Sequence, residues 1–146
     1  MLNGVEIKWT ARWIYLDVNL ISGSKFNCCI NQKIRKFYRA ANHIFRIEGK
    51  SDDLLMLQLI ETHCIPILTY AIEVIFVMDR DVRRQLRVAY NSVFRRIFNY
   101  RPWQSVSELQ SFLSRPTWEQ LLEKRICKFE HSIQKDTFLS AIFCPT

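Results

Sequence analysis

Glycine and proline are scarce in this chain, which has 3 and 4 of them among 146 residues. Both residues mark turns and interrupt regular elements, so their scarcity argues against the many short strands and turns of a β-sandwich or barrel. Hydrophobic residues make up 49% of the chain, which provides enough apolar surface for a core and argues against disorder throughout. We therefore predict a mainly α fold: a helical bundle with a short N-terminal β-hairpin.

The chain also lacks CxxC pairs, and its first residues lack the basic and then apolar profile of a secretory signal. The 5 cysteines are an odd set and fit reduced thiols, so we expect the protein in the nucleus or the cytoplasm. Cys127 and His131 lie four residues apart on a predicted helix but are too few to hold zinc, and we predict no metal site and no cofactor. Because Met1 is followed at once by strand-like sequence, we expect a fragment of a longer reading frame.

No lysine or arginine occurs in the largely apolar segment from residue 51 to residue 78. Its length suits a membrane span, but Glu61 and Glu73 lie inside it and Pro66 interrupts it. We predict buried helices here, divided near Cys64 by Pro66, and no membrane association.

Alternation of apolar and polar residues predicts β-structure near the N-terminus. Over Trp13–Ile21 it predicts one half-buried strand, and Val5, Ile7 and Trp9 alternate in the same way upstream. We predict that these two strands form a β-hairpin within residues 1–26, ended by a turn at 22–24, and that residues 27–146 form the helical bundle.

Apolar residues that recur every three or four positions predict amphipathic helices in the rest of the chain. One begins near Ile30 and ends at Gly49, a second begins at a cap within residues 51–53, and a third follows Asp79 and ends before Arg101-Pro102. A capping box over residues 105–108 opens a short helix, and Pro116 begins the last one. The predicted buried stripes are Ile34, Phe37, Ala41 and Ile44 in the first helix, Val82, Leu86, Ala89, Val93 and Ile97 in the third, and Trp118, Leu122, Ile126, Phe129 and Ile133 in the last.

The net charge is +7 and the isoelectric point about 9.4, so the protein attracts polyanions. Many cations fall on two helical faces that lie opposite predicted buried stripes. Guanidinium groups bind phosphate through a fixed fork of donors, so these faces suit the backbone of a duplex. The alternative is an ordinary solvated basic surface. The candidate nucleic-acid-binding residues are Lys25 beside the hairpin, Arg35, Lys36, Arg39 and Arg46 on one helix, and Arg80, Arg84, Arg87 and Arg95 on another.

Catalytic machinery is not readable in the sequence. Asp52-Asp53, the adjacent acidic pair, lies at a predicted helix start, where capping explains it better than the metal binding of a polymerase. No serine or cysteine occupies a sharp glycine-flanked turn of the kind that presents a nucleophile. We therefore predict no catalytic residue.

Four segments in a fixed order carry a family resemblance: residues 13–26, 33–40, 60–71 and 121–125. Their order resembles the region after the catalytic palm in reverse transcriptases of LINE-type, non-LTR retrotransposons, from about Lys8 to about Phe129. In that family the strand-turn unit is the primer-grip hairpin, and the helices after it form the thumb that holds the template–primer duplex. The resemblance implies that residues 13–26 correspond to the grip and residues 30–99 to the thumb. This chain has Asp17 and Ala71 at two positions where the family commonly has glycine.

The resemblance implies a non-specific partner, the backbone of an RNA/DNA or DNA duplex. The aromatic-x-Asp-Asp motif of the palm and its companion aspartate are absent, so we expect no RNA-directed DNA polymerase activity from this chain alone. Two alternatives remain open at this point. One is a degenerate retroelement remnant without a selected function. The other is a helical protein-interaction module that docks a partner protein or a second copy of itself through Phe94 and Phe98, which we predict to be exposed on the arginine side of their helix.

Overall fold

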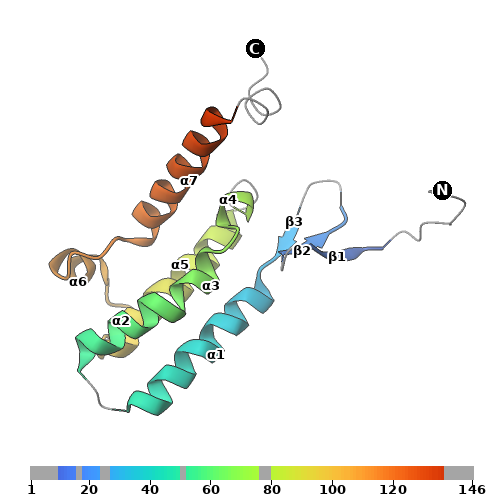
Figure 1. Ribbon diagram of the computed structural model, residues 1–146. Helices are drawn as coiled ribbons and strands as arrows, with labels where there is room; N and C mark the ends of the chain where they lie inside the picture. The colour runs from blue at the N-terminus through green and yellow to red at the C-terminus, as the bar shows by residue number, and fades with distance from the viewer. Residues whose placement is uncertain (1–9, 16–17, 24–26, 50–51, 76–79, 137–146) are drawn as a thin grey trace, which may run out of the picture.

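A computed structural model describes residues 10–15, 18–23, 27–49, 52–75 and 80–136, which form three strands and seven helices (Figure 1). This confirms the predicted mainly α class with a short N-terminal β element. The strands are β1 (Arg12–Tyr15), β2 (Val18–Ile21) and β3 (Asn27–Cys29), and the helices are α1 (Asn31–Glu48), α2 (Asp53–His63), α3 (Ile65–Thr69), α4 (Ile72–Ile75), α5 (Arg80–Ile97), α6 (Ser107–Phe112) and α7 (Trp118–Lys135).

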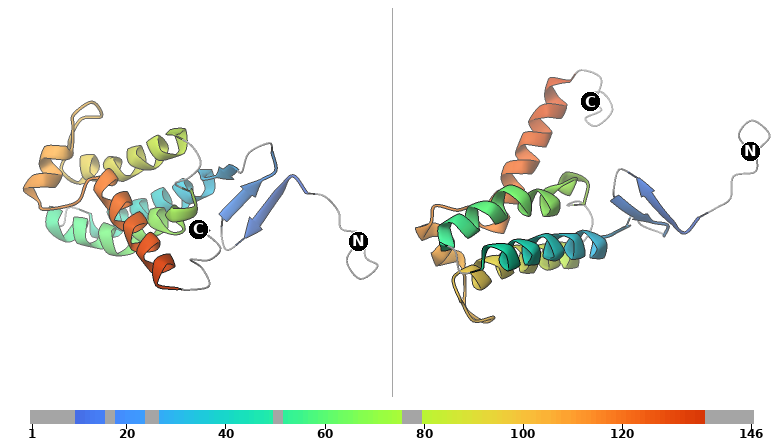
Figure 2. Two further views of the ribbon diagram at one scale, coloured as in Figure 1. Left: turned by 90° about the horizontal axis from the view of Figure 1, so that it is seen from above. Right: turned by 60° about the horizontal axis from the view of Figure 1, so that its bottom comes forward.

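The bundle is built on α1 and α5, which run in the same direction because the α2–α4 segment carries the chain back between them (Figure 1). Two contacts fix this alignment: the Ser92 hydroxyl lies 3.2 Å from the Tyr38 hydroxyl, and one turn further along both helices Arg96 donates a hydrogen bond to Asn42. The sheet projects from one end of the bundle, α6 lies at the other end, and α7 packs against α4 and α5 (Figure 2).

The core is made from one apolar stripe of each long helix and from buried residues of the α2–α4 segment, among them Leu57, Ile60 and Leu68. The stripe predicted for α5 is confirmed in full, and Tyr90 is buried beside it. In α1, Phe37 and Ala41 are buried, whereas Ile34 and Ile44 are partly buried against the core. Trp118 brings α7 into the core, with its ring 5.5 Å from that of Tyr90. Within the described residues, every helix is too short or too polar to cross a bilayer.

Most of the predicted helix boundaries are confirmed. α1 ends at Gly49, whose φ of 59° suits glycine, and Asp52 caps α2 by accepting a hydrogen bond from the Leu54 amide at 3.4 Å. Pro66 divides α2 from α3 at Cys64, as predicted. The cap predicted at Asp79 lies outside the described residues.

The capping box predicted over residues 105–108 is wrong. The N-cap of α6 is Val106, which makes no side-chain cap hydrogen bond. A complete capping box occurs instead at the start of α7. There Thr117 accepts from the Gln120 amide at 3.3 Å, and the Gln120 side chain accepts from the Thr117 amide at 2.9 Å.

The prediction of one strand over Trp13–Ile21 is also wrong, because the segment forms two antiparallel strands. β1 pairs with β2 in the register Tyr15↔Val18 and Trp13↔Leu20. Directly opposed residues share one face of a sheet, so Trp13 and Tyr15 lie on the face of Val18 and Leu20. A continuous strand would have put them on opposite faces, and alternation alone does not reveal a reversal between strands.

The sheet is also larger and more exposed than predicted. β3 pairs with β2 and extends the sheet past residue 26, the predicted end of the hairpin. Val18 is buried, but the side chains of Trp13, Ile14 and Tyr15 are each 61% exposed, so β1 is not a half-buried strand. The strand predicted over residues 5–9 lies outside the described residues.

Three aromatic residues differ from their predicted positions. Phe94 is 1% exposed, with its ring 5.2 Å from that of Tyr90, and Phe98 is partly buried against the core. The predicted exposure of this pair is therefore wrong, and self-association through it loses its basis. Phe129, predicted to be buried, is 45% exposed because α7 contributes to the core mainly through Trp118 and Leu122 near its start.

Ala71 has a backbone conformation that favours glycine. It lies between α3 and α4 with φ of 51°, in the left-handed region where an L side chain crowds the following carbonyl. The preceding residue, Tyr70, is anchored there, because its carbonyl accepts a hydrogen bond from the Lys33 ammonium group of α1. The tight turn that returns the chain toward α5 is therefore strained at Ala71.

We expect Ala71→Gly to raise the free energy of unfolding by about 0.5–1 kcal/mol, because glycine removes the left-handed penalty and this gain exceeds its added unfolded-state entropy. Urea denaturation followed by circular dichroism measures the change. As a control, Ala40→Gly within α1 should lower the stability by about 1 kcal/mol. A destabilised Ala71→Gly variant would contradict the strain.

Candidate nucleic-acid interface

The outer face of α1 carries a basic groove of about 580 Å³. Arg35, Arg39 and Arg46 recur at steps of four and seven, so they share the side of the helix opposite the buried Phe37 and Ala41. All three are exposed and have no carboxylate partner among the described residues. We call the groove lined by Arg35, Tyr38, Arg39, Asn42, His43 and Arg46 the α1 groove.

The packing of α5 against α1 adds a fourth cation, which the sequence analysis missed. The Arg96 guanidinium stacks on the Phe45 ring at 4.1 Å from its centroid and donates a hydrogen bond to Asn42, a residue of the α1 groove. Stacking and hydrogen bonding together fix a planar guanidinium at the groove edge. No signal in the sequence pairs Arg96 with Asn42, which lies 54 positions earlier, so only the fold reveals its place.

The predicted arginines of α5 lie in a different environment. Arg80, Arg84 and Arg87 line a second depression, of about 520 Å³, whose other wall is the side of α7 that carries Glu119 and Glu123. Arg87 forms an ion pair with Glu119 at 3.4 Å, with both side chains at least half exposed. The carboxylates of α7 offset part of the positive potential of these arginines, in contrast to the α1 groove.

Among the described residues, two further predicted cations, Lys36 and Arg95, belong to neither group. The Arg95 side chain donates to the Gln104 carbonyl at 3.1 Å and so holds the connection between α5 and α6. Lys36 lines a small cavity beside β2 and β3 rather than the α1 groove. Lys25 lies outside the described residues. The predicted set of cations is thus divided among separate surfaces, and three of its members form one groove.

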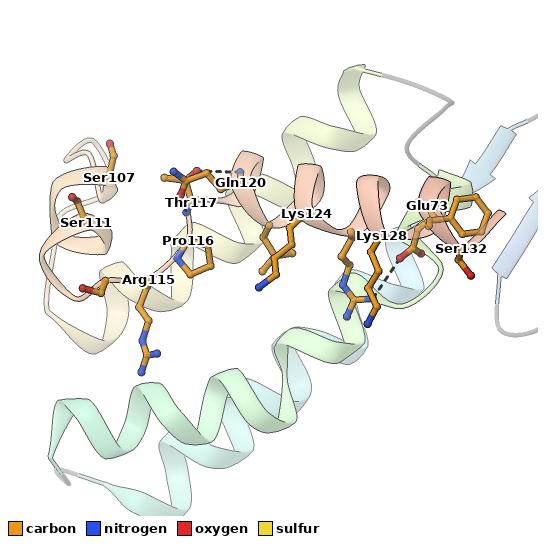
Figure 3. Close-up of a pocket in the computed structure, with 14 residues that line it drawn as sticks. Glu73, Ser107, Ser111, Arg115, Pro116, Thr117, Gln120, Lys124, Lys128 and Ser132 are labelled. Carbon is orange, nitrogen blue, oxygen red and sulfur yellow. Dashed lines mark hydrogen bonds and ion pairs between the residues drawn. The ribbon is translucent and has the colours of Figure 1, made fainter. Parts of the chain in front are cut away.

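A third basic surface was not predicted at all. It is a groove of about 1010 Å³ along α6 and α7, where Arg115, Lys124 and Lys128 point to the same side (Figure 3). The sequence contains a signal for this surface, because two lysines at positions i and i+4 share one side of a helix. The acidic residues of α7, which are close to these lysines in the sequence, obscure that signal. We call it the α7 groove.

Two ion pairs fasten the α7 groove to the bundle. Arg115 lies 3.2 Å from the carboxylate of Glu61 in α2, and Arg125 lies 3.5 Å from that of Glu73 in α4. Arg125 also donates to the Thr69 carbonyl at 3.3 Å. Since one partner in each pair is mostly shielded from water, these contacts fix the position of α7 better than fully exposed pairs would.

The buried titratable groups do not suit nucleophilic catalysis. Burial raises the pKa of the Cys64 thiol to about 11, so this cysteine is protonated at neutral pH. Burial also raises the pKa of the Cys28 thiol, although Lys33 opposes the shift. Tyr90 has a pKa raised by burial and by the charge of Glu61, and its hydroxyl donates to the Pro116 carbonyl at 2.8 Å.

Metal binding also finds no support in the part of the chain that the structure describes. That part contains no group of three or more histidine, cysteine or acidic residues placed to hold an ion. Cys127 and His131 are both exposed on α7, and Asp52 is committed to capping α2. The ring of His63 lies 3.2 Å from the Leu59 carbonyl, one turn earlier in α2.

Comparison of the chain with protein-family models, with curated proteins and with solved structures finds no match.

Glu61 gives a prediction for the dependence of stability on pH. Burial raises the pKa of its carboxyl group above the ordinary value of 4.5, and Arg115 only partly offsets this. The folded protein then binds the proton at a higher pH than the unfolded chain, so this group destabilises the fold at neutral pH and does so less as the pH falls toward 4.5.

We therefore expect Glu61→Gln to melt at a higher temperature than the unaltered protein at pH 7, and this difference to shrink at pH 5. Thermal unfolding followed by circular dichroism at both pH values measures it. Glu130→Gln removes the same charge from an exposed position of α7 and serves as the control, with a similar melting difference at both pH values. A difference for Glu61→Gln that grows on acidification would show that the ion pair with Arg115 outweighs burial.

Proposed function

We propose that this chain binds the sugar–phosphate backbone of a nucleic-acid duplex, RNA/DNA or DNA, without sequence preference, through the α1 groove. The observation that carries this proposal is a groove lined by three exposed arginines with no carboxylate in its lining. Asn42, His43 and Tyr38 supply further polar groups of the kinds that contact phosphates and sugars.

The dimensions of α1 support backbone binding. Arg35 and Arg46 are eleven residues apart, which corresponds to about 16 Å along a helix. Phosphates along one strand of a duplex follow one another at about 3.4 Å of helix axis, so the row spans several of them. Arginine forks bind phosphate oxygens regardless of the base attached, which fits binding without sequence preference.

The proposed origin is the thumb region of a LINE-type reverse transcriptase, without the catalytic palm. The order of the four sequence segments that resemble this family supports it. Ala71 supports it as well, because the family commonly has glycine at this position and the backbone there has a φ of 51°. In this proposal the chain is not an enzyme, and β1 and β2 correspond to the grip. Codons for the missing aspartate motif in the same frame of the upstream DNA would support this origin.

We expect binding of an RNA/DNA hybrid to weaken steeply with salt, because each neutralised phosphate releases counterions. Fluorescence anisotropy with a labelled hybrid across a salt series measures the slope of log K against log salt. Replacing Arg35, Arg39 and Arg46 together by Gln should reduce that slope by about 2.7, at roughly 0.9 per lost phosphate contact.

The matched control replaces Arg80, Arg84 and Arg87 by Gln, with the same loss of charge from the surface that faces Glu119 and Glu123. We expect this variant to keep a slope close to that of the unaltered protein. Equal losses from both triple variants would mean that net charge, rather than the α1 groove, determines binding. An unchanged slope in the α1 variant would refute the proposal.

A further inference from the structure

The α7 groove is a second candidate binding site, separate from the α1 groove. The two grooves share no lining residue. The α7 groove lies between α6, α7 and the end of the α2–α4 segment, and its size of about 1010 Å³ is at the upper end of the range for ligand sites.

The charges of α7 are sorted onto opposite sides of the helix. Lys124, Arg125 and Lys128 line the α7 groove, whereas Glu119 and Glu123 line the depression shared with α5. This sorting gives the α7 groove an excess of positive charge.

Two cations of this groove are left for a ligand. Arg115 and Arg125 already pair with Glu61 and Glu73, but Lys124 and Lys128 have no carboxylate partner among the described residues. These two lysines are four positions apart, so they lie one above the other on the helix and repel each other. An anion held between them would remove that repulsion.

An aromatic ring lies beside these cations. Phe129 lines the same groove and is 45% exposed, although a phenylalanine gains by burial. A ring next to a row of cations is the arrangement with which proteins hold single-stranded nucleic acid: the cations follow the backbone and a base stacks on the ring. The bases of a duplex are covered by their neighbours and do not offer this face.

We propose that the α7 groove binds single-stranded nucleic acid, with Lys124 and Lys128 on the phosphates and Phe129 stacked on a base. The stretch that lines the groove from the N-cap of α7 at Thr117 to Ser132 is about 22 Å long and accommodates several nucleotides. The hydroxyl groups of Ser111 and Ser132, which also line the groove, add hydrogen-bonding capacity for phosphates and base edges. The proposal does not depend on duplex binding by the α1 groove.

Fluorescence anisotropy of the full chain with a labelled oligothymidylate of about ten nucleotides, which does not pair with itself, tests this site. Replacing Lys124 and Lys128 together by Gln should reduce the salt slope by about 1.4, at roughly 0.7 per phosphate contact of a single strand. The charge-matched control, Arg35→Gln with Arg39→Gln, should weaken hybrid binding and leave oligothymidylate binding nearly unchanged. If the control variant lost oligothymidylate binding and the double lysine variant kept it, the proposal would be overturned.

Variants of Phe129 distinguish a site for single-stranded nucleic acid from a site that binds any anion. We expect Phe129→Ala to weaken oligothymidylate binding by about fivefold or more, and Phe129→Trp to retain it, because a larger ring still stacks. Phe112→Ala is the matched control, since Phe112 is 85% exposed on α6 and does not line the groove. Full displacement of the oligonucleotide by polyglutamate, together with unchanged binding by Phe129→Ala, would identify a general anion site and overturn the proposal. Weak binding by the folded Phe129→Trp variant would do the same.

Discussion

The burial of one apolar stripe per long helix determines where the cations of this protein lie. Phe37 and Ala41 turn one side of α1 inward, and Val82, Leu86 and Val93 do the same for α5, so the arginines between them face outward. The return of the chain through α2–α4 then sets α1 and α5 parallel. Periodicity explains why the cations are exposed, and the packing of helices explains which of them meet.

The sequence predicted several features that depend on local chemistry, although the capping box expected over residues 105–108 was wrong. Gly49, Asp52 and Pro66 each fix a boundary through their own backbone or side-chain preference, and all three predictions were confirmed. The features that depend on distant residues were missed. Arg96 lies at the edge of the α1 groove through its contacts with Asn42 and Phe45, and Arg87 pairs with Glu119, which lies 32 positions later. Phe94 is buried because several elements surround α5, which widens the buried side of this helix beyond a single stripe.

Helix α7 shows how one element serves two surfaces. Trp118 and Leu122 attach its first turns to the core, while the ion pair of Arg125 with Glu73 attaches its middle to α4. With these contacts fixed, Glu119 and Glu123 face the arginines of α5, and Lys124 and Lys128 face the opposite side. The helix therefore lowers the positive potential on one surface and raises it on another. The surface of this basic protein is thus divided into regions of weaker and stronger positive potential.

The exposed strand β1 has a consequence for handling the protein. In the described part of the chain it lies at the edge of the sheet, and Trp13, Ile14 and Tyr15 present apolar surface on both of its faces. Such edges favour strand pairing between molecules, and mutual repulsion at a net charge of +7 opposes that aggregation. High ionic strength screens the repulsion. A wash with concentrated salt, used to strip nucleic acid during purification, would therefore also promote precipitation.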